Sequence, residues 1–177
     1  RVTVAPAPTA SFSITSSCPN TIVPITNTTN TAGTPYDNSY SFEWDFGNGL
    51  LSFIDNPSLV TYDTPGVYSV TLTTTNAIGC IDDTVIDVTI FDPPTADFIA
   101  DTVCLGEPTN FTDISTVPTG SIAVQEWIFG EFIFGGASTT YVYDSSGIQS
   151  ATLIVTSSDG CTDTITKPVN VDALPIA

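Results

Sequence analysis

The sequence of 177 residues contains no histidine and no methionine, and its only basic side chains are Arg1 and Lys167. Without histidine the chain lacks the commonest general base and cannot form a serine–histidine triad. The 19 acidic residues give a net charge of −17 at pH 7, which repels nucleic acids and anionic membrane surfaces. No apolar run is long enough to span a bilayer. We therefore expect no nucleic-acid partner and no direct membrane insertion, with any export signal or anchor outside these residues.

A unit of about 80 residues occurs twice in the chain. Cys18 and Cys104 are 86 residues apart, whereas Cys80 and Cys161 are 81 apart, so the second unit is five residues shorter between its cysteines. Three of these residues are lost before the single tryptophan of the unit and two after it. Length changes of this kind belong in surface loops.

Fragments of the same unit flank the two complete copies. Val2-Thr3-Val4 matches Val88-Thr89-Ile90 at the end of the first unit, and Val169-Asn170-Val171 repeats the pattern. The arrangement predicts a segment of a longer tandem array. The expected divisions are a terminal strand of a preceding repeat with its linker at 1–7, a first domain at 8–92, a second domain at 93–173 and the start of a further linker at 174–177.

Each unit carries two cysteines at equivalent positions. We predict one disulfide within each unit, Cys18 with Cys80 and Cys104 with Cys161, each contributing ~4 kcal/mol through closure of a long loop. The competing interpretation, metal ligation, has neither CxxC spacing nor a histidine to support it. Disulfides imply an oxidising, extracytoplasmic compartment.

Apolar and polar residues alternate with a period of two along most of the chain, which indicates half-buried β-strands. Turn signals such as Gly47-Asn48-Gly49 and Thr64-Pro65-Gly66 separate the strands at short spacing. About seven short strands per unit predict an all-β fold of two tandem, immunoglobulin-like antiparallel sandwiches, joined by a short, proline-rich linker. The inward-facing positions assigned to the core are Trp44, Phe46, Tyr62, Leu72, Trp127, Phe129, Tyr143 and Leu153.

The run Trp44-Asp45-Phe46-Gly47-Asn48-Gly49, followed by Asn56-Pro57, Tyr62 and Pro65-Gly66-Val67-Tyr68, resembles the PKD (polycystic kidney disease) domain family. The second copy, Trp127-Ile128-Phe129-Gly130, keeps the aromatic pair and loses the aspartate. The resemblance implies a β-sandwich that serves as a spacer or adhesive module of secreted and cell-surface proteins, without catalysis. The usual aspartate of the following turn is replaced by Asn48 and Glu131, which weakens the case for a cation bound in that turn.

The cysteine arrangement, with Gly79-Cys80 and Gly160-Cys161, resembles that of PKD-rich giant surface proteins of Bacteroidota. Those bacteria O-glycosylate Asp-Ser/Thr followed by a small aliphatic residue, and the pattern occurs at Thr84, Thr102 and Thr164. The alternative is that these Asp-Thr pairs cap turns through side-chain hydrogen bonds. Asn27 and Asn110 fit the N-glycosylation pattern, which matters only where the producing cell has the machinery.

No group of side chains in the sequence suggests catalysis. Neighbouring acids such as Asp82 and Asp83 point to opposite faces of a strand, and the second unit does not keep both. We therefore expect no enzyme activity, no cofactor and no catalytic residue. No Asp-x-Asp-x-Asp-Gly loop occurs, so calcium near Asp82 and Asp83, or around Asp92, stands only as a weak alternative to solvated charge.

The function expected from these features is structural or adhesive: a segment of a long extracellular repeat protein on a bacterial surface. Its partners would be neighbouring repeats, identical subunits, surface glycans or other cells. One variant is self-assembly, in which Val2-Thr3-Val4 completes the sandwich of a neighbouring subunit by strand addition. The alternative is a spacer or carbohydrate-binding module of a secreted hydrolase, with Phe53, Phe132 and Phe134 as candidate platform aromatics.

Overall fold

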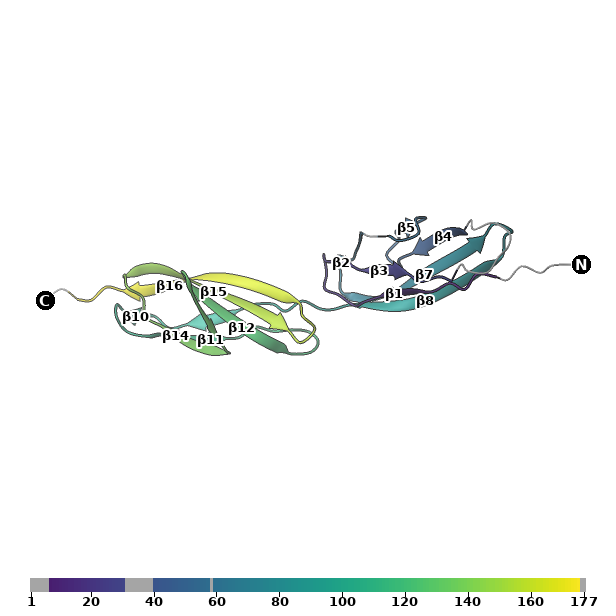
Figure 1. Ribbon diagram of the computed structural model, residues 1–177. Coiled ribbons are helices and arrows are strands. Elements are labelled where there is room, and N and C mark those ends of the chain that lie inside the picture. The colour runs from purple at the N-terminus through teal and green to yellow at the C-terminus, as the bar shows by residue number, and fades with distance from the viewer. Residues whose placement is uncertain (1–6, 31–39, 58, 176–177) are drawn as a thin grey trace, which may run out of the picture. The chain divides into compact units, whose positions relative to one another are not determined.

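The computed structural model describes residues 7–30, 40–57 and 59–175 and divides the chain into two compact units, Arg1–Phe91 and Asp92–Ala177 (Figure 1). Within the described residues every regular element is a β-strand, and each unit has eight. The predicted class, all-β with two tandem immunoglobulin-like sandwiches, is confirmed. The expected strand Val2-Thr3-Val4 lies outside the described residues.

The first unit is built around a four-stranded sheet with the order β5-β4-β7-β8. Its members are β4 (Tyr40–Asp45), β5 (Leu51–Ser52), β7 (Gly66–Asn76) and β8 (Ile81–Ile90). Two antiparallel strand pairs complete the sandwich: β1 (Phe12–Ile14) with β3 (Ile25–Asn27), and β2 (Ile22–Val23) with β6 (Val60–Thr61). The ladder between β7 and β8 is the longest of the unit and joins 66–75 to Ile81–Ile90.

The second unit has a five-stranded sheet of order β10-β16-β15-β12-β13 and a three-stranded sheet of order β14-β11-β9. The larger sheet contains β10 (Val103–Cys104), β12 (Ile122–Phe129), β13 (Phe132–Gly135), β15 (Gly147–Ser157) and β16 (Thr162–Asp172). The smaller sheet contains β9 (Phe98–Ala100), β11 (Thr109–Asp113) and β14 (Ser138–Tyr141).

The core of each unit is organised around its tryptophan. Trp44 is fully buried, donates its indole N–H to the carbonyl oxygen of Ile54 (3.0 Å) and meets the ring of Phe12 edge-on. Trp127 is equally buried and donates to the carbonyl oxygen of Gly136 (2.8 Å). The bonded indole satisfies the one polar atom that burial of tryptophan brings inside. The side chains assigned to the core from sequence are all buried: Trp44, Phe46, Tyr62, Leu72, Trp127, Phe129, Tyr143 and Leu153.

The two units differ most in the turn after the tryptophan strand. In the first unit, Asn48 lies where the resemblance leads one to expect an aspartate. Its side-chain oxygen accepts the N–H of Leu50 (3.1 Å), and its amide donates to the carbonyl oxygen of Thr61 (3.3 Å). In the second unit a two-residue turn containing Glu131 pairs Phe129 with Phe132. The shorter turn produces the four-residue strand β13, whose side chains are all exposed.

In each unit the first segment of the chain lies along the last strand and runs in the same direction. In unit 1, the N–H of Ala10 donates to Asp82 near the start of β8 (2.8 Å), and Ser17 forms a parallel bridge with Ile90 at the end. In unit 2, Ala96 donates to Asp163 (2.7 Å), and β10 pairs in parallel with the end of β16. We call these contacts, between 10–17 and β8 and between 96–105 and β16, the closing seam.

The turn at Gly47 provides a test of local packing. Gly47 has φ +70°, and a Cβ there would lie 2.8 Å from the carbonyl oxygen of Ser69; Gly49 has φ +85° and open space around it. Alanine in the left-handed conformation lowers the stability of the folded state by ~1 kcal/mol at either position. Only Gly47→Ala must also displace the backbone of Ser69. We expect Gly47→Ala to lower the melting temperature of unit 1 clearly more than Gly49→Ala, measured by calorimetry. Equal shifts would contradict this packing.

Candidate functional site

The prediction of one disulfide within each unit is wrong. Cys80 and Cys104 are free thiols, whereas Cys18 and Cys161 are disulfide-bonded. The cysteine pairs expected from sequence, Cys18 with Cys80 and Cys104 with Cys161, are therefore not formed.

The length of the last strand explains this result. In unit 1, Cys18 follows Ser17, which pairs with Ile90 at the end of β8, whereas Cys80 directly precedes the start of β8. Ten strand residues separate the two ends by about 30 Å, but the Cα atoms of a disulfide lie within ~7 Å of each other. In unit 2, Cys104 pairs with Asp172 at the end of β16, and Cys161 precedes its start. The alternation of the last strand in the sequence gives its length, but only the parallel pairing with the first segment places Cys18 and Cys104 at its far end.

The four cysteines therefore fall into two structural kinds. We call Cys18 and Cys104 the strand-end cysteines, because they lie beside the end of the last strand. Cys80 and Cys161 are the hairpin cysteines, because they lie in the turn before that strand. Each unit has one cysteine of each kind.

The two hairpin turns have the same backbone geometry despite different sequences. In unit 1, the side-chain oxygen of Asn76 accepts the N–H of Cys80 (2.9 Å), and the Asn76 N–H donates to the Cys80 carbonyl (3.0 Å). In unit 2, the hydroxyl of Ser157 accepts the N–H of Cys161 (3.1 Å), and the Ser157 N–H donates to the Cys161 carbonyl (2.8 Å). A buried polar side chain thus fixes the hairpin cysteine in both units.

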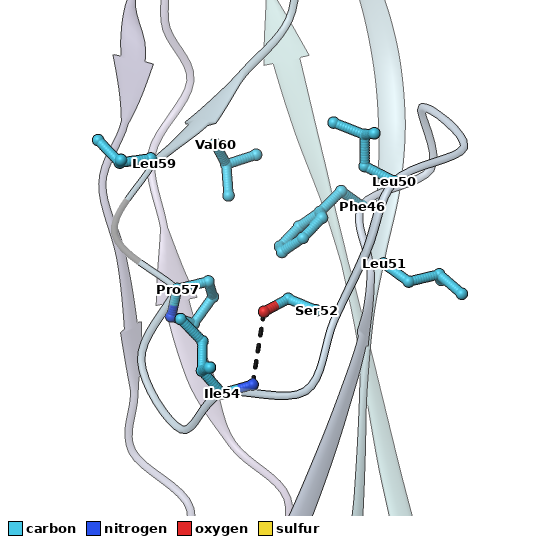
Figure 2. A pocket seen from close by; sticks show the side chains of 8 residues that line it. All are labelled: Phe46, Leu50, Leu51, Ser52, Ile54, Pro57, Leu59 and Val60. Atoms are coloured by element: carbon cyan, nitrogen blue, oxygen red, sulfur yellow. Dashed lines mark hydrogen bonds between the residues drawn. The ribbon is translucent and has the colours of Figure 1, made fainter.

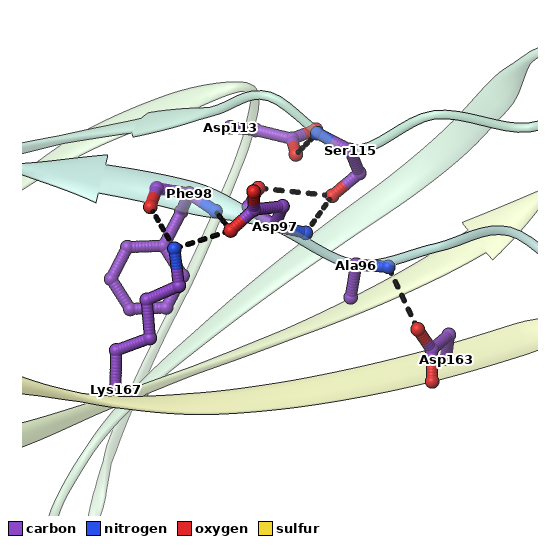
Figure 3. Close-up of polar contacts among 7 residues, drawn as sticks. All are labelled: Ala96, Asp97, Phe98, Asp113, Ser115, Asp163 and Lys167. Carbon is purple, nitrogen blue, oxygen red and sulfur yellow. Dashed lines mark hydrogen bonds and ion pairs between the residues drawn. The ribbon is translucent and has the colours of Figure 1, made fainter.

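Lys167 forms a polar network in the closing seam of unit 2 (Figure 3). Its ammonium group donates to the carbonyl oxygen of Phe98 (2.6 Å), forms an ion pair with Asp97 and lies 5.1 Å from the centre of the Phe98 ring. Unit 1 has Ser11 and Ile86 at the positions of Asp97 and Lys167. The network therefore ties β9 to β16 in one unit only, and its role is structural.

The hydrogen bond from Lys167 is the main cause that holds the pKa of Asp97 below its ordinary value. The N–H of Phe98, which donates to the same carboxylate (2.9 Å), and the positive charge of the lysine act in the same direction. A lowered carboxyl pKa stabilises the folded state above the unfolded pKa, and this contribution is lost as pH falls through the folded pKa.

Removal of the lysine provides the test. In Lys167→Met the pKa of Asp97 should rise toward its ordinary value of 3.8. NMR titration of the Asp97 carboxyl carbon measures this change. The natural protein should have a higher melting temperature than this variant at neutral pH, and the difference should become smaller below about pH 4. Lys167→Arg keeps a positive donor and should keep the pKa low. An unchanged Asp97 titration in Lys167→Met would show that the ion pair does not form.

Two of the three acidic residues named as calcium candidates accept hydrogen bonds from other parts of the protein. Asp82 accepts the N–H of Ala10 in the closing seam, and Asp92 accepts a hydrogen bond from the hydroxyl of Thr119 (3.2 Å). Asp83 is exposed on the opposite face of the strand from Asp82. Across the described ranges, no three histidine, cysteine, aspartate or glutamate side chains converge in a way that could hold a metal ion.

The candidate glycosylation sites have different surroundings. Thr102 and Thr164 are exposed, whereas Thr84 is half-buried and donates its hydroxyl to the carbonyl oxygen of Ala10 (2.7 Å). The side-chain amide of Asn27 donates to both the backbone and the carboxylate of Asp55. The amide of Asn110 donates to Asp101 (2.9 Å). Modification of Thr84 would therefore disturb the closing seam, whereas Thr102 and Thr164 are accessible without such a loss.

Unit 1 has an apolar pocket of about 300 Å³ (Figure 2). The side chains that line it include no ionisable group; they are Phe46, Leu50, Leu51, Ser52, Ile54, Pro57, Leu59 and Val60. Leu59 at the rim is 79% exposed. The one hydroxyl in the lining, on Ser52, accepts the N–H of Ile54 (3.4 Å), so the pocket offers mainly apolar contact.

Unit 2 has an aromatic surface patch where β13 meets β14, formed by Phe132, Phe134 and Tyr141. The rings of Phe132 and Phe134 each lie 6.2 Å from that of Tyr141, and Phe132 is 59% exposed. A pocket of about 300 Å³ beside Phe132 and Tyr141 also has polar lining from Glu131, Asp144 and Gln149. Phe53, the third candidate aromatic, is exposed in unit 1.

Two buried tyrosines, Tyr62 in unit 1 and Tyr143 in the lining of the unit 2 pocket, are structural. Burial is the main cause that raises the pKa of Tyr62 to about 12, with contributions from Tyr68 and Asp45. Burial also raises the pKa of Tyr143 to about 12, with a smaller contribution from Tyr141. Tyr62 donates its hydroxyl to the carbonyl oxygen of Phe46 (3.0 Å) and stays protonated as a donor at neutral pH.

The part of the chain that the structure describes contains no helix long and apolar enough to cross a membrane.

The geometry defines the chain as a pair of immunoglobulin-like sandwiches, in which the polar side chains described above form hydrogen bonds that hold strands and turns in place. The family model of the PKD domain matches residues 4–90 and 91–172, almost the whole sequence. The chain therefore belongs to the PKD domain family, whose members are typically non-catalytic domains of extracellular proteins. A disulfide is consistent with that environment.

Solved structures with a similar fold include two single PKD domains. The PKD1 domain of the Vibrio cholerae metalloprotease PrtV is 30% identical; the match covers 45% of this chain and 98% of that one, with a TM-score of 0.41. The PKD1 domain of Vibrio anguillarum Epp is 24% identical over 46% of this chain and 96% of that one, with a TM-score of 0.43. The fibronectin(III)-like modules of Clostridium thermocellum CbhA are 14% identical over 92% and 95%, with a TM-score of 0.46. No curated protein matches the chain.

Proposed function

We propose that the chain is a non-catalytic, load-bearing segment of a long extracellular repeat protein, which acts as a stalk, filament or adhesin of a bacterial surface. The observation that carries the proposal is the closing seam, which occurs in both units although their sequences have diverged. The seam links the beginning of each unit to its last strand, and that strand leads out of the unit at the opposite end.

The direction of the strands in the seam determines how it responds to force. The first segment of unit 1 begins near the start of β8 and reaches its end at Ser17, whose N–H donates to Thr89 (3.1 Å) and whose carbonyl accepts from Phe91 (2.9 Å). Leu105 donates to Asp172 (2.8 Å) at the corresponding place in unit 2. When the two chain ends of a unit are pulled apart, parallel neighbours of this kind slide along each other. Their hydrogen bonds are therefore loaded together rather than one after another.

The composition of the surface supports the same function. The described residues hold no metal-binding cluster, and the lining of the unit 1 pocket includes no acid or base. The net charge of −17 keeps neighbouring chains apart unless a specific contact joins them.

Single-molecule stretching of the chain in a reducing buffer, held by its two ends, tests the proposal. Asp82→Ala removes the acceptor of the Ala10 N–H and should lower the unfolding force of unit 1, with a loss of ~1–2 kcal/mol in stability. Asp83→Ala makes the same change of charge at an exposed position and should leave the force unchanged. The unfolding peak of unit 2 is an internal control. Two units that extend without a distinct force peak would exclude a load-bearing role.

A second candidate function, carbohydrate binding as a module of a secreted hydrolase, is favoured by the aromatic patch of unit 2. Exposed rings next to carboxylate and amide groups can stack on the apolar face of a sugar while polar groups bind its hydroxyls. The patch on β13 and β14 combines Phe132 and Tyr141 with Gln149 and Asp144 in this way.

Affinity electrophoresis in gels containing soluble polysaccharides checks this candidate. Phe132→Ala should abolish any retardation of the chain, because it removes the most exposed ring of the patch. Phe53→Ala removes an exposed ring from unit 1 and should leave the retardation intact. Migration that no polysaccharide changes would exclude the candidate.

A further inference from the structure

Each structural kind of cysteine, and each unit, has one disulfide-bonded member and one free thiol. One strand-end cysteine, Cys18, and one hairpin cysteine, Cys161, are disulfide-bonded. The other strand-end cysteine, Cys104, and the other hairpin cysteine, Cys80, are free thiols. Each free thiol therefore has a disulfide-bonded counterpart at the equivalent position of the other unit.

The equivalence extends to the backbone around each cysteine. Val103 pairs with Val171 beside Cys104, and Ser17 pairs with Ile90 beside Cys18, in both cases in parallel. The hairpin cysteines share the turn described above, in which the residue four positions earlier bonds to the cysteine N–H and carbonyl. Both kinds of position are thus compatible with a disulfide in this fold, and the free thiols occupy the same geometry as the bonded ones.

Neither free thiol can reach the other cysteine of its own unit, because the last strand holds the two about 30 Å apart. Cys104 is exposed and Cys80 is half-buried, so both can meet a partner from outside the unit. Acidic residues lie near both cysteines, with Glu107 and Asp172 near Cys104 and Asp82 near Cys80. Because like charges oppose association, we expect a contact at these ends to form most readily in salt that screens them.

We propose that Cys104 and Cys80 form disulfides with neighbouring PKD units, each with a cysteine of the complementary kind. Cys104 takes a hairpin cysteine, and Cys80 takes a strand-end cysteine. The unit that supplies the partner belongs either to the same polypeptide or to a second copy of this chain. The identity of the partner as another PKD unit rests on the proposed function as a segment of a long repeat protein.

The reaction needs an oxidant of the class of low-molecular-weight disulfides, such as oxidised glutathione. The thiolate of Cys104 attacks one sulfur of glutathione disulfide and releases one glutathione thiolate. The thiolate of the hairpin cysteine then attacks the Cys104 sulfur of the mixed disulfide and releases the second glutathione. Two protein thiols lose two protons and two electrons, and one glutathione disulfide becomes two molecules of glutathione.

The test begins with the natural chain, alkylated while folded and before reduction. Mass spectrometry should find two alkyl groups, on Cys80 and Cys104, with Cys18 and Cys161 still disulfide-bonded. The chain is then concentrated in a glutathione redox buffer with enough salt to screen its charge. A ladder of disulfide-linked multimers is expected on non-reducing gels. Fewer than two reactive thiols in the folded chain would overturn the proposal at this first step.

Two single variants determine which cysteines pair. Cys104→Ser retains only Cys80 as a free thiol, and Cys80→Ser retains only Cys104. Neither alone should form multimers, whereas a mixture, with one variant isotopically labelled, should give a mixed dimer whose crosslink joins Cys104 to Cys80. Dimers of one variant with itself, formed as readily as the mixed dimer, would overturn the complementary pairing. Circular dichroism shows whether each variant is folded.

A tandem duplicate, with two copies of the chain in one polypeptide, distinguishes the two sources of the partner. A Cys104–Cys80 crosslink within monomeric duplicate assigns the partner to the same polypeptide, and the ladder of separate chains assigns it to a second copy. If peptide mapping finds this crosslink in neither preparation, the proposal is wrong. None of these measurements involves force, so their failure would leave the load-bearing function to its own test.

Discussion

The closing seam is the contact on which the rest of each unit depends. Ala10 and Ala96 donate to Asp82 and Asp163 near the start of the last strand, and the strand-end cysteine segments pair with its far end. Because the first segment follows the last strand over its length, the chain enters each unit at one end and leaves at the other. This directionality suits a repeat that transmits force, and it separates the two cysteines of a unit.

The core around the tryptophan is the same in both units, and the differences lie in turns and edges. Both tryptophans keep the same buried position and a hydrogen bond from the indole to a backbone carbonyl. Around this constant centre, the second unit shortens one turn and gains the exposed strand β13. It also places Lys167 and Asp97 in the seam, where unit 1 has Ile86 and Ser11. Conserved packing with variable edges is expected for repeats that share a fold and differ in their contacts.

Sequence reasoning reached the fold and the core because both depend on local periodicity. Alternation along β4 and β7 places Trp44, Val70 and Leu72 on one face, and the same residues are buried in the structure. It failed at the cysteines, because pairing depends on the distance between residues that are remote in sequence. It also did not identify the network of Lys167, since Phe98, in β9, is 69 residues away and Asp97 directly precedes that strand.

By itself, the amino-acid sequence determined that this protein is a tandem of acidic β-sandwiches with tryptophan-centred cores. Strand periodicity, turn residues and charge are local properties that can be read from consecutive residues. Only the tertiary structure decided which end of a unit each cysteine occupies, which carboxylates close the seam and which aromatic rings reach the surface. The physical reason is the antiparallel ladder that ends in β8 or β16. The last strand holds the two cysteines of a unit about 30 Å apart, while the seam brings residues distant in sequence into hydrogen-bonding contact.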